Sequence, residues 1–353
     1  MMKNDITPIV RPLLAWYDTH KRTLPWRGTT DPYRVLISEI MLQQTRVAAV
    51  IPYYERWMTE LPDVASLAAA EEERLMKLWQ GLGYYSRARN LHRAAKAVME
   101  NYGGQFPSTY ESLLTLPGVG DYTAGAVASI AFHEPVPAVD GNILRVAARV
   151  TGNDGDILDP KVRRQFRDLM VSAIPRDRPG EWNQALMDLG AMVCLPNGTP
   201  QCENCPLAAL CEAKRQNLQE KLPVRKKKAQ RRTEELTVFL LLRDGKIALR
   251  RREKNGLLAG LWEFPHVPGA LPEPDASAPL AAWGLTPREW RKRLEAKHIF
   301  THVEWRMTGY VLTVTGENTD FTWVDRPGLE ALAVPSAFAK YLEEARRALE
   351  ELP

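Results

Sequence analysis

The chain has 353 residues, of which 45% are apolar and 25% charged. This length exceeds what one hydrophobic core usually organises, and the composition is that of a folded globular protein, which excludes disordered, collagen-like and low-complexity chains. No run approaches 18 uninterrupted apolar residues, and the N-terminal residues lack an apolar signal core. We therefore expect a cytoplasmic protein with two domains.

Residues 1–215 carry a helical pattern. Apolar side chains recur at intervals of three and four, as at Leu75, Leu78 and Leu82, and proline or glycine interrupts the runs. We expect an all-α domain of about ten helices joined by short connections.

The pattern changes after residue 215. Between Lys214 and Arg232 there are nine Lys or Arg against one acid, a local charge of +8 in a chain whose net charge is +4. Such a run is either a solvated linker or a contact for a polyanion, of which nucleic acid is the commonest. Because the segment is polar, contains Pro223 and has no apolar period, residues 216–235 are predicted to be a linker.

Residues 236–353 are predicted to form a smaller α+β domain. Apolar and β-branched runs predict strands, Asp244-Gly245 predicts a hairpin turn, and an amphipathic pattern predicts a closing helix. The strands are expected at Thr237–Leu242, Lys246–Arg250, Val303–Thr315 and Phe321–Val324, and the helix at Ser336–Leu352.

All four cysteines lie close together in the sequence, at Cys194, Cys202, Cys205 and Cys211. A disulfide framework spreads its cysteines, whereas this arrangement gathers thiols about one point, as metal sites do. Zinc usually takes two tight Cys-x-x-Cys pairs, and this segment has one. The spacing therefore favours an iron–sulfur cluster over zinc.

A glycine-rich corner lies at Leu116-Pro117-Gly118-Val119-Gly120. Two glycines in a tight turn before a helix expose backbone N–H groups that suit a DNA phosphate, although an ordinary corner between helices has the same composition. The form Gly-x-Gly-x-Tyr-Ser/Thr occurs here and again from Gly81 to Ser86, so the helical domain is expected to use this corner twice.

Two carboxylates are candidates for acid–base chemistry. Glu39 is expected inside an apolar helix, Arg34–Val47, with Gln43 and Arg46 along the same face. Burial there should raise its pKa, which suits a general acid. Asp140 is expected to cap the helix that begins near Gly141, where the helix dipole favours the ionised form. The simpler interpretations are a surface glutamate and a plain N-cap.

Together these motifs resemble those of the MutY-type adenine DNA glycosylases, of the helix-hairpin-helix glycosylase superfamily. The similarity runs from about Leu24 to Cys211, and the segments keep the family order: Ser38–Thr45, Gly81–Tyr85, Leu116–Gly120, Val139–Asn142 and the cysteines. The resemblance implies a 4Fe–4S cluster, and a monomeric, nucleoid-associated repair enzyme that flips adenine opposite 8-oxoguanine or guanine out of duplex DNA and hydrolyses its glycosidic bond.

The resemblance also implies roles for individual residues. Glu39 would protonate adenine, Asp140 would stabilise the sugar cation, Tyr122 would orient Asp140, and Asn142 would complete the catalytic group. The hairpin is a candidate site for a structural cation. DNA or base contacts are implied for Arg27, Gln44, Tyr84, Gly118, Gly120, Gln184, Phe300, Thr301 and His302.

Residues 236–353 resemble the Nudix-like domain of the same enzymes. The hydrolase box, an Arg-Glu-x-x-Glu-Glu run with its preceding glycine, is missing between Gly256 and Arg306, so this domain should bind and not hydrolyse. The run Phe300-Thr301-His302 resembles the family loop that reads 8-oxoguanine, usually Phe-Ser-His. The alternative is strand core for Phe300 and a surface position for His302.

Three other functions are weighed. Endonuclease III is the near relative, but its lysine nucleophile is replaced here by Tyr122, which leaves lyase chemistry without an amine. A non-catalytic DNA-binding scaffold would not need Glu39 and Asp140, and a nucleotide hydrolase would need the missing box. One departure concerns the first cysteine interval, which has seven residues where the family usually has six and carries no basic residue. It puts a DNA contact by this loop in doubt.

Overall fold

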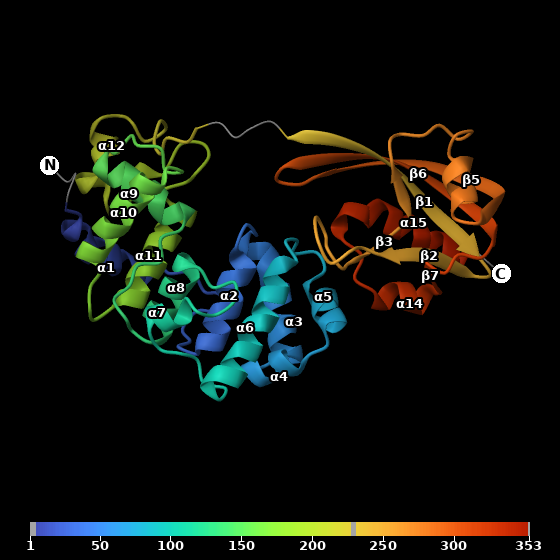
Figure 1. Ribbon diagram of the computed structural model, residues 1–353. Helices are drawn as coiled ribbons and strands as arrows, with labels where there is room; N and C mark the ends of the chain where they lie inside the picture. The colour runs from blue at the N-terminus through green and yellow to red at the C-terminus, as the bar shows by residue number, and fades with distance from the viewer. Residues whose placement is uncertain (1–4, 227–230, 352–353) are drawn as a thin grey trace. The chain divides into compact units, whose positions relative to one another are not determined.

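The computed structural model describes residues 5–226 and 231–351 (Figure 1). The chain divides into two compact units. The first contains residues 1–70 and 89–227, and the second contains residues 71–88 and 228–353. No helix among the described residues is long and apolar enough to cross a membrane.

The first unit is all-α, as expected. Helices α5 (Glu72–Trp79) and the start of α6 (Ser86–Tyr102) group with the second unit. The other helices are α1 (Val10–His20), α2 (Pro32–Leu42), α3 (Val47–Glu60), α4 (Val64–Ala69), α7 (Tyr110–Leu113), α8 (Asp121–Ala131), α9 (Gly141–Thr151), α10 (Pro160–Ala173), α11 (Pro179–Met192) and α12 (Glu212–Arg215).

Small residues let α8 lie at the centre of this unit, where it packs against α2 and α11. Ala124, Ala126 and Ala128 are fully buried. A Cβ on Gly125 would lie 2.5 Å from the carbonyl oxygen of Pro137, so the backbones approach closely there. This packing brings the starts of α8 and α9 toward α2, and the candidate site lies there.

The expectation of one helix over Arg34–Val47 is wrong. Helix α2 starts after its N-cap Asp31 and ends at Leu42. The C-cap Gln43 leaves the helical conformation with ψ 115°, Gln44 follows in a left-handed conformation with φ +57°, and Arg46 is the N-cap position of α3. Gln43 and Arg46 therefore do not continue the face of α2 that carries Glu39.

The second unit contains a mixed sheet with the strand order β3-β2-β1-β6-β5, in which β4 also pairs with β1 and β7 with β2. The long strands β1 and β6 are parallel, and β5 runs antiparallel to β6. Bounds are β1 Arg232–Arg243, β2 Lys246–Arg251, β3 Trp262–Glu263, β4 His266–Pro268, β5 Leu285–Ile299, β6 Val303–Gly316, β7 Thr322–Val324, α13 Ser277–Ala282, α14 Arg326–Ala331 and α15 Ala339–Glu350.

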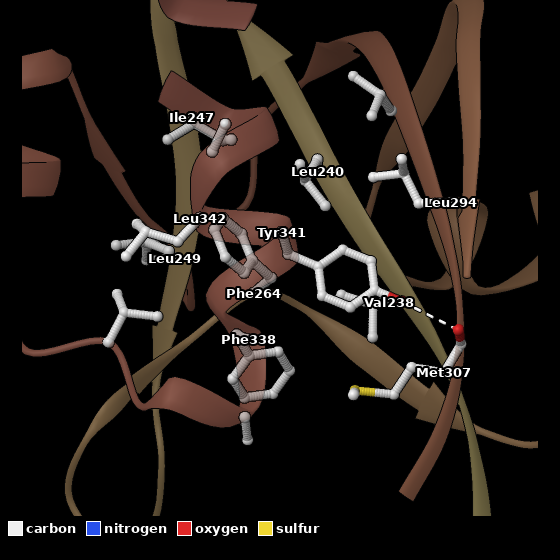
Figure 2. Packing of buried hydrophobic residues seen from close by; sticks show 14 of the residues in the cluster. Val238, Leu240, Ile247, Leu249, Phe264, Leu294, Met307, Phe338, Tyr341 and Leu342 are labelled. Atoms are coloured by element: carbon white, nitrogen blue, oxygen red, sulfur yellow. Dashed lines mark hydrogen bonds between the residues drawn. The ribbon is translucent and has the colours of Figure 1, made fainter. Parts of the chain in front are cut away.

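At the strand β1 both faces of this sheet are buried, which explains the unbroken apolar run in β1. On one face Tyr341 of α15 packs among strand side chains and donates a hydrogen bond to the Met307 carbonyl, 3.1 Å away (Figure 2). A Cβ on Gly309 would lie 2.2 Å from Tyr341, so glycine is needed beneath the ring. The other face buries Phe239 and Leu241 against α13 and its neighbours.

Two features of this unit differ from the sequence analysis. The 15-residue strand β5 was not predicted, because only Leu285 and Leu294 on it are buried. Strand β1 begins at Arg232, inside the segment expected to be a linker. The turn at Asp244-Gly245 is confirmed, and both residues have positive φ, +49° and +70°, as a tight hairpin requires.

Candidate active site

Glu39 and Tyr122 form a hydrogen-bonded pair in the first unit. Glu39 lies on α2 and is only 6% exposed. The hydroxyl of Tyr122, in the first turn of α8, donates a hydrogen bond to Oε2 of Glu39. Burial raises the pKa of Glu39, although this hydrogen bond and the positive charge of Arg27 lower it in part. The pKa of Tyr122 lies well above its usual value, first because of burial and then because of Glu39.

Asp140 caps α9, as expected. One carboxylate oxygen accepts from the N–H of Ile143 and the other from Nδ2 of Asn142, both at 2.7 Å. The expectation that the helix terminus keeps its pKa low is not met, because burial raises the pKa and outweighs these donors. The hydroxyl of Tyr122 donates to Glu39 and not to Asp140, so Asn142 is the side chain that orients Asp140.

The two carboxyls are close enough to influence each other, since the charge of Asp140 raises the pKa of Glu39. The site therefore combines an acid held by a phenol with a second carboxyl held by an amide and a helix N-terminus. Such a pair can donate a proton at one point and stabilise positive charge at another.

Arg145 connects this site to the cysteine segment, and the sequence analysis missed it. It is 3% exposed and lies one turn after Asn142 on α9. Its Nη2 donates to Oδ1 of Asn142 at 2.9 Å and to the Gly190 carbonyl at 2.7 Å, while Nε donates to the Cys194 carbonyl at 2.8 Å. The available signal in the sequence was a charged residue inside the apolar run Ile143-Leu144-Arg145-Val146.

A second polar network positions Arg27 and Gln184. The Tyr17 hydroxyl donates to Oε1 of Gln184 at 2.6 Å and accepts from Nη1 of Arg27 at 3.0 Å. Nη2 of Arg27 also donates to Asp188, a fully buried carboxylate that binds Arg22 as well. A cavity of about 460 Å³ is lined partly by Tyr17, Arg27 and Gln184. Tyr17 and Asp188 were not found from the sequence.

The four cysteines are free thiols, each partly buried. Burial raises the pKa of Cys205 to about 12, and the three other thiols each add to the rise, so all four lie within electrostatic reach of one another. Nη1 of Arg149 lies 3.2 Å from Sγ of Cys194. Among the described residues, no group of three or more His, Cys, Asp or Glu is arranged to hold a single metal ion.

The glycine-rich corner at Leu116–Gly120 is a tight turn between α7 and α8. Gly118 has φ +77°, and a Cβ there would lie 2.4 Å from Cβ of Asn90 on α6, so only glycine fits. The N–H of Val119 donates to the Leu116 carbonyl, which corrects the expectation of several consecutive free N–H groups. Gly120 is the N-cap of α8 and is exposed.

The candidate lesion-reading residues lie in the second unit, on the turn between β5 and β6. Phe300 is half-buried, with its ring 4.9 Å from that of Trp305, whereas His302 is exposed. Oγ1 of Thr301 lies 2.7 Å from the hydroxyl of Tyr84, which belongs to the same unit. Tyr84 has φ +46° and is 48% exposed, so its ring is held out by a left-handed backbone.

The chain matches two family models, the HhH-GPD superfamily of base excision DNA repair proteins over residues 37–171 and the NUDIX domain over residues 237–344. It is 35% identical to the adenine DNA glycosylase of Rattus norvegicus, covering 97% of this chain and 79% of the relative. For the enzyme of Schizosaccharomyces pombe the identity is 32%, over 90% of this chain and 85% of the relative.

The chain belongs to the adenine DNA glycosylase family. It is accordingly a monofunctional, DNA-binding glycosylase of base excision repair that removes adenine, and the resemblance seen in its motifs is confirmed.

Solved structures agree on the fold of the first unit of this adenine DNA glycosylase family member. It is similar to a thermostable thymine-DNA glycosylase, with 30% identity and a TM-score of 0.54 over 59% of this chain and 96% of that one. A non-covalent Endonuclease III–DNA complex shares the fold, with 24% identity and a TM-score of 0.53 over 62% of this chain and 99% of that one.

Proposed function

We propose that this enzyme excises adenine paired with 8-oxoguanine, or with guanine, from duplex DNA, and that it acts as a monomer. The observation that carries the proposal is the pairing of the buried Glu39 with the partly buried Asp140, two carboxyls in one site with different hydrogen-bond partners. Adenine leaves as a neutral base only when its five-membered ring is protonated, and this requires a carboxylic acid that keeps its proton near neutral pH.

Glu39 and Asp140 have different roles in the proposed reaction. Glu39, whose raised pKa favours the protonated form, donates its proton to N7 of the flipped adenine as the C1′–N9 bond breaks and its electron pair passes to the base. The sugar is left as an oxocarbenium-like cation, which Asp140 stabilises electrostatically or by a transient covalent bond. Glu39, now ionised, accepts a proton from the water that attacks C1′, and the acid is restored.

The flipped base needs a pocket that fixes its orientation, and Arg27, Tyr17 and Gln184 suit this task. Their hydrogen bonds to one another and to Asp188 hold their polar atoms in place before the base enters. The positive charge of Arg27 also lowers the pKa of Glu39 and of Tyr122, so Arg27 lies near the proton donor. Gln44 and Tyr84, both with left-handed backbones, are proposed to fill the space that the base vacates.

A 4Fe–4S cluster bound by Cys194, Cys202, Cys205 and Cys211 fits the residues present. The support is the number of thiols, their spacing and their mutual effect on pKa. When bound, the cluster would supply a structural cross-link, since adenine hydrolysis requires no electron. Arg145 and Arg149 hold Cys194 from the α9 side through its carbonyl and its sulfur.

Discrimination between 8-oxoguanine and thymine opposite the adenine is proposed to come from the Nudix-like unit. Thr301 and His302 offer a hydroxyl and a ring N–H at the tip of the β5–β6 turn, and 8-oxoguanine differs from guanine at C8 and N7, where such groups can bind. A base without these acceptors would lose the hydrogen bonds that 8-oxoguanine makes, at about 0.5–1.5 kcal/mol each.

Single-turnover excision on four duplexes tests the function: adenine opposite 8-oxoguanine, guanine and thymine, and an oxidised pyrimidine. We expect rapid release of adenine opposite 8-oxoguanine, slower release opposite guanine and almost none opposite thymine, with strand cleavage appearing only after alkali. Cleavage of the oxidised pyrimidine alone would contradict the proposal and favour an Endonuclease III-like activity. Sedimentation of the DNA complex tests the monomer.

A further inference from the structure

A cavity of about 860 Å³ lies in the first unit, lined by the loop that follows Cys194 and by the start of the basic segment. Residues 196–199, which follow Cys194, and residues 220–225 form much of its wall. Four basic side chains line it against a single acidic one, and these are Arg145, Arg149, Lys221, Arg225 and Glu220. None of the reaction steps above uses this cavity.

The first half of the expected linker is anchored, and this anchoring builds the cavity. Leu222 is 3% exposed, and its carbonyl accepts a hydrogen bond from Nε of Arg149 at 2.9 Å. The carbonyl of Val224 accepts from the N–H of Ile157 at 3.1 Å, in an isolated parallel bridge with Asp156. Residues 220–225 therefore belong to the fold of the first unit and are held against α9.

No cation of this cavity forms an ion pair with an acidic side chain among the described residues. Lys221 and Arg225 are exposed, and neither makes an ion pair within residues 5–226 and 231–351. Arg149 uses Nε and Nη1 on two carbonyls and the Cys194 sulfur, and its Nη2 bonds to no other described group. The acid Glu220 is itself occupied, since Oε1 accepts from the hydroxyl of Thr199 at 2.9 Å.

The loop wall adds backbone donors. In the described part of the chain, the N–H groups of Asn197, Gly198 and Thr199 donate to no protein acceptor, and all three residues are exposed. Gly198 has φ +75°, and successive N–H groups around a left-handed residue can form an anion-binding concavity. This loop has no basic side chain of its own, so the positive charge comes from Arg149, Lys221 and Arg225.

We propose that this cavity is a binding site for a phosphate-bearing anion. Its donors are guanidinium, ammonium and backbone N–H groups, which match the oxygens of a phosphate and offer little to a neutral or cationic ligand. The phosphate can belong to the backbone of bound DNA, in which case the site rests on the proposed function and extends the DNA contact to the cysteine segment. It can also belong to a free polyphosphate.

Calorimetric titration with sodium tripolyphosphate tests the site directly. We compare the full-length protein with Lys221→Ala/Arg225→Ala and with a matched control, Arg231→Ala/Arg232→Ala, which removes the same charge from the same basic segment outside the cavity. We expect the wild type and the control to bind and the first variant to lose at least about tenfold in affinity, since each lost charge-assisted contact costs about 1.5–3 kcal/mol. Thermal melting checks folding, and Lys221→Gln/Arg225→Gln provides a second variant.

A second measurement distinguishes the two sources of phosphate. If DNA supplies it, the slope of log Kd against log salt for duplex binding falls by about two for the cavity variant relative to the control, since each phosphate contact contributes about 0.9. A lower affinity for tripolyphosphate with an unchanged slope assigns the site to a free ligand. The proposal is overturned if the wild type does not bind tripolyphosphate and the variant and control have equal slopes. The titration uses no adenine, so its outcome is independent of the excision assay.

Discussion

The hydroxyl of Tyr122 donates a hydrogen bond to the carboxylate of Glu39, which places a phenol where the lyases of this fold are expected to carry an amine. A phenol whose pKa lies well above its usual value is no nucleophile at neutral pH. Its effect on Glu39 is to stabilise the ionised form, so it limits how far burial raises the pKa of the acid.

The pH profile of Tyr122→Phe tests this effect. In the proposed reaction Glu39 is protonated and Asp140 ionised, so the rate should fall as pH rises through the pKa of Glu39 and fall again as pH drops through that of Asp140. Both pKa values are raised by burial. Removing the phenol raises the pKa of Glu39 further, and the alkaline limb should move to higher pH. Tyr110→Phe, which removes a tyrosine–carboxylate hydrogen bond to the exposed Asp121, should leave the limb in place.

Replacing either carboxyl should abolish most of the activity. We expect Glu39→Gln and Asp140→Asn each to slow single-turnover excision by at least about a hundredfold, the usual scale for a general acid or a charge-stabilising group. Binding of a duplex with a non-cleavable adenine analogue should be retained, which separates chemistry from recognition. Near wild-type rates in either variant contradict its assigned role.

Glu39→Gln should also stabilise the protein near neutral pH. The folded-state pKa of Glu39 is raised. The contribution of this carboxyl to the free energy of unfolding is therefore fully present below the unfolded pKa and is lost as pH rises through the folded pKa. A neutral amide avoids this loss, which is about 1.4 kcal/mol for every pH unit that separates the folded and unfolded pKa values. The melting temperature of the variant should exceed that of the wild type by a margin that grows as the pH rises from the unfolded pKa of Glu39 to its folded pKa and then stays constant. Glu100→Gln, exposed on α6, should show no such trend.

The metal content of the purified protein tests the cysteine site. We expect about four irons per chain and a broad absorbance at the border of the visible range, as for a cluster with four cysteine ligands. Cys202→Ala and Cys205→Ala should each lose iron and lower the melting temperature. Stoichiometric zinc in place of iron after anaerobic purification would refute the cluster.

The reading of the opposite base is tested by Thr301→Ala/His302→Ala in the full-length protein. Truncation after Glu235 would cut through β1, and Phe300 packs on Trp305, so both changes would disturb the fold. We expect excision opposite guanine to persist and the preference for 8-oxoguanine to fall. Thr286→Ala, exposed on β5, is the control. An unchanged ratio of the two rates means that this turn does not read the lesion.

The sequence by itself determined the features that depend on local pattern. The helical period of residues 1–215, the apolar run in β1, the Asp244-Gly245 turn and the N-cap at Asp140 each follow from a few neighbouring residues. The family was identifiable for the same reason, since its motifs are short runs of residues in a fixed order.

Only the tertiary structure decided the partners and the charge states. Strand β5 is held by its pairing with β6, although its own sequence is charged and contains a proline. The backbone of Gln43 and Gln44 leaves the helical conformation and ends α2, a change that no apolar period signals. Tyr122 is hydrogen-bonded to Glu39, and Arg149 to Leu222, across long stretches of chain. Asn142 is hydrogen-bonded to both Asp140 and Arg145 at the start of α9. Burial and hydrogen bonding set each pKa, and both depend on residues that meet only when the chain has folded.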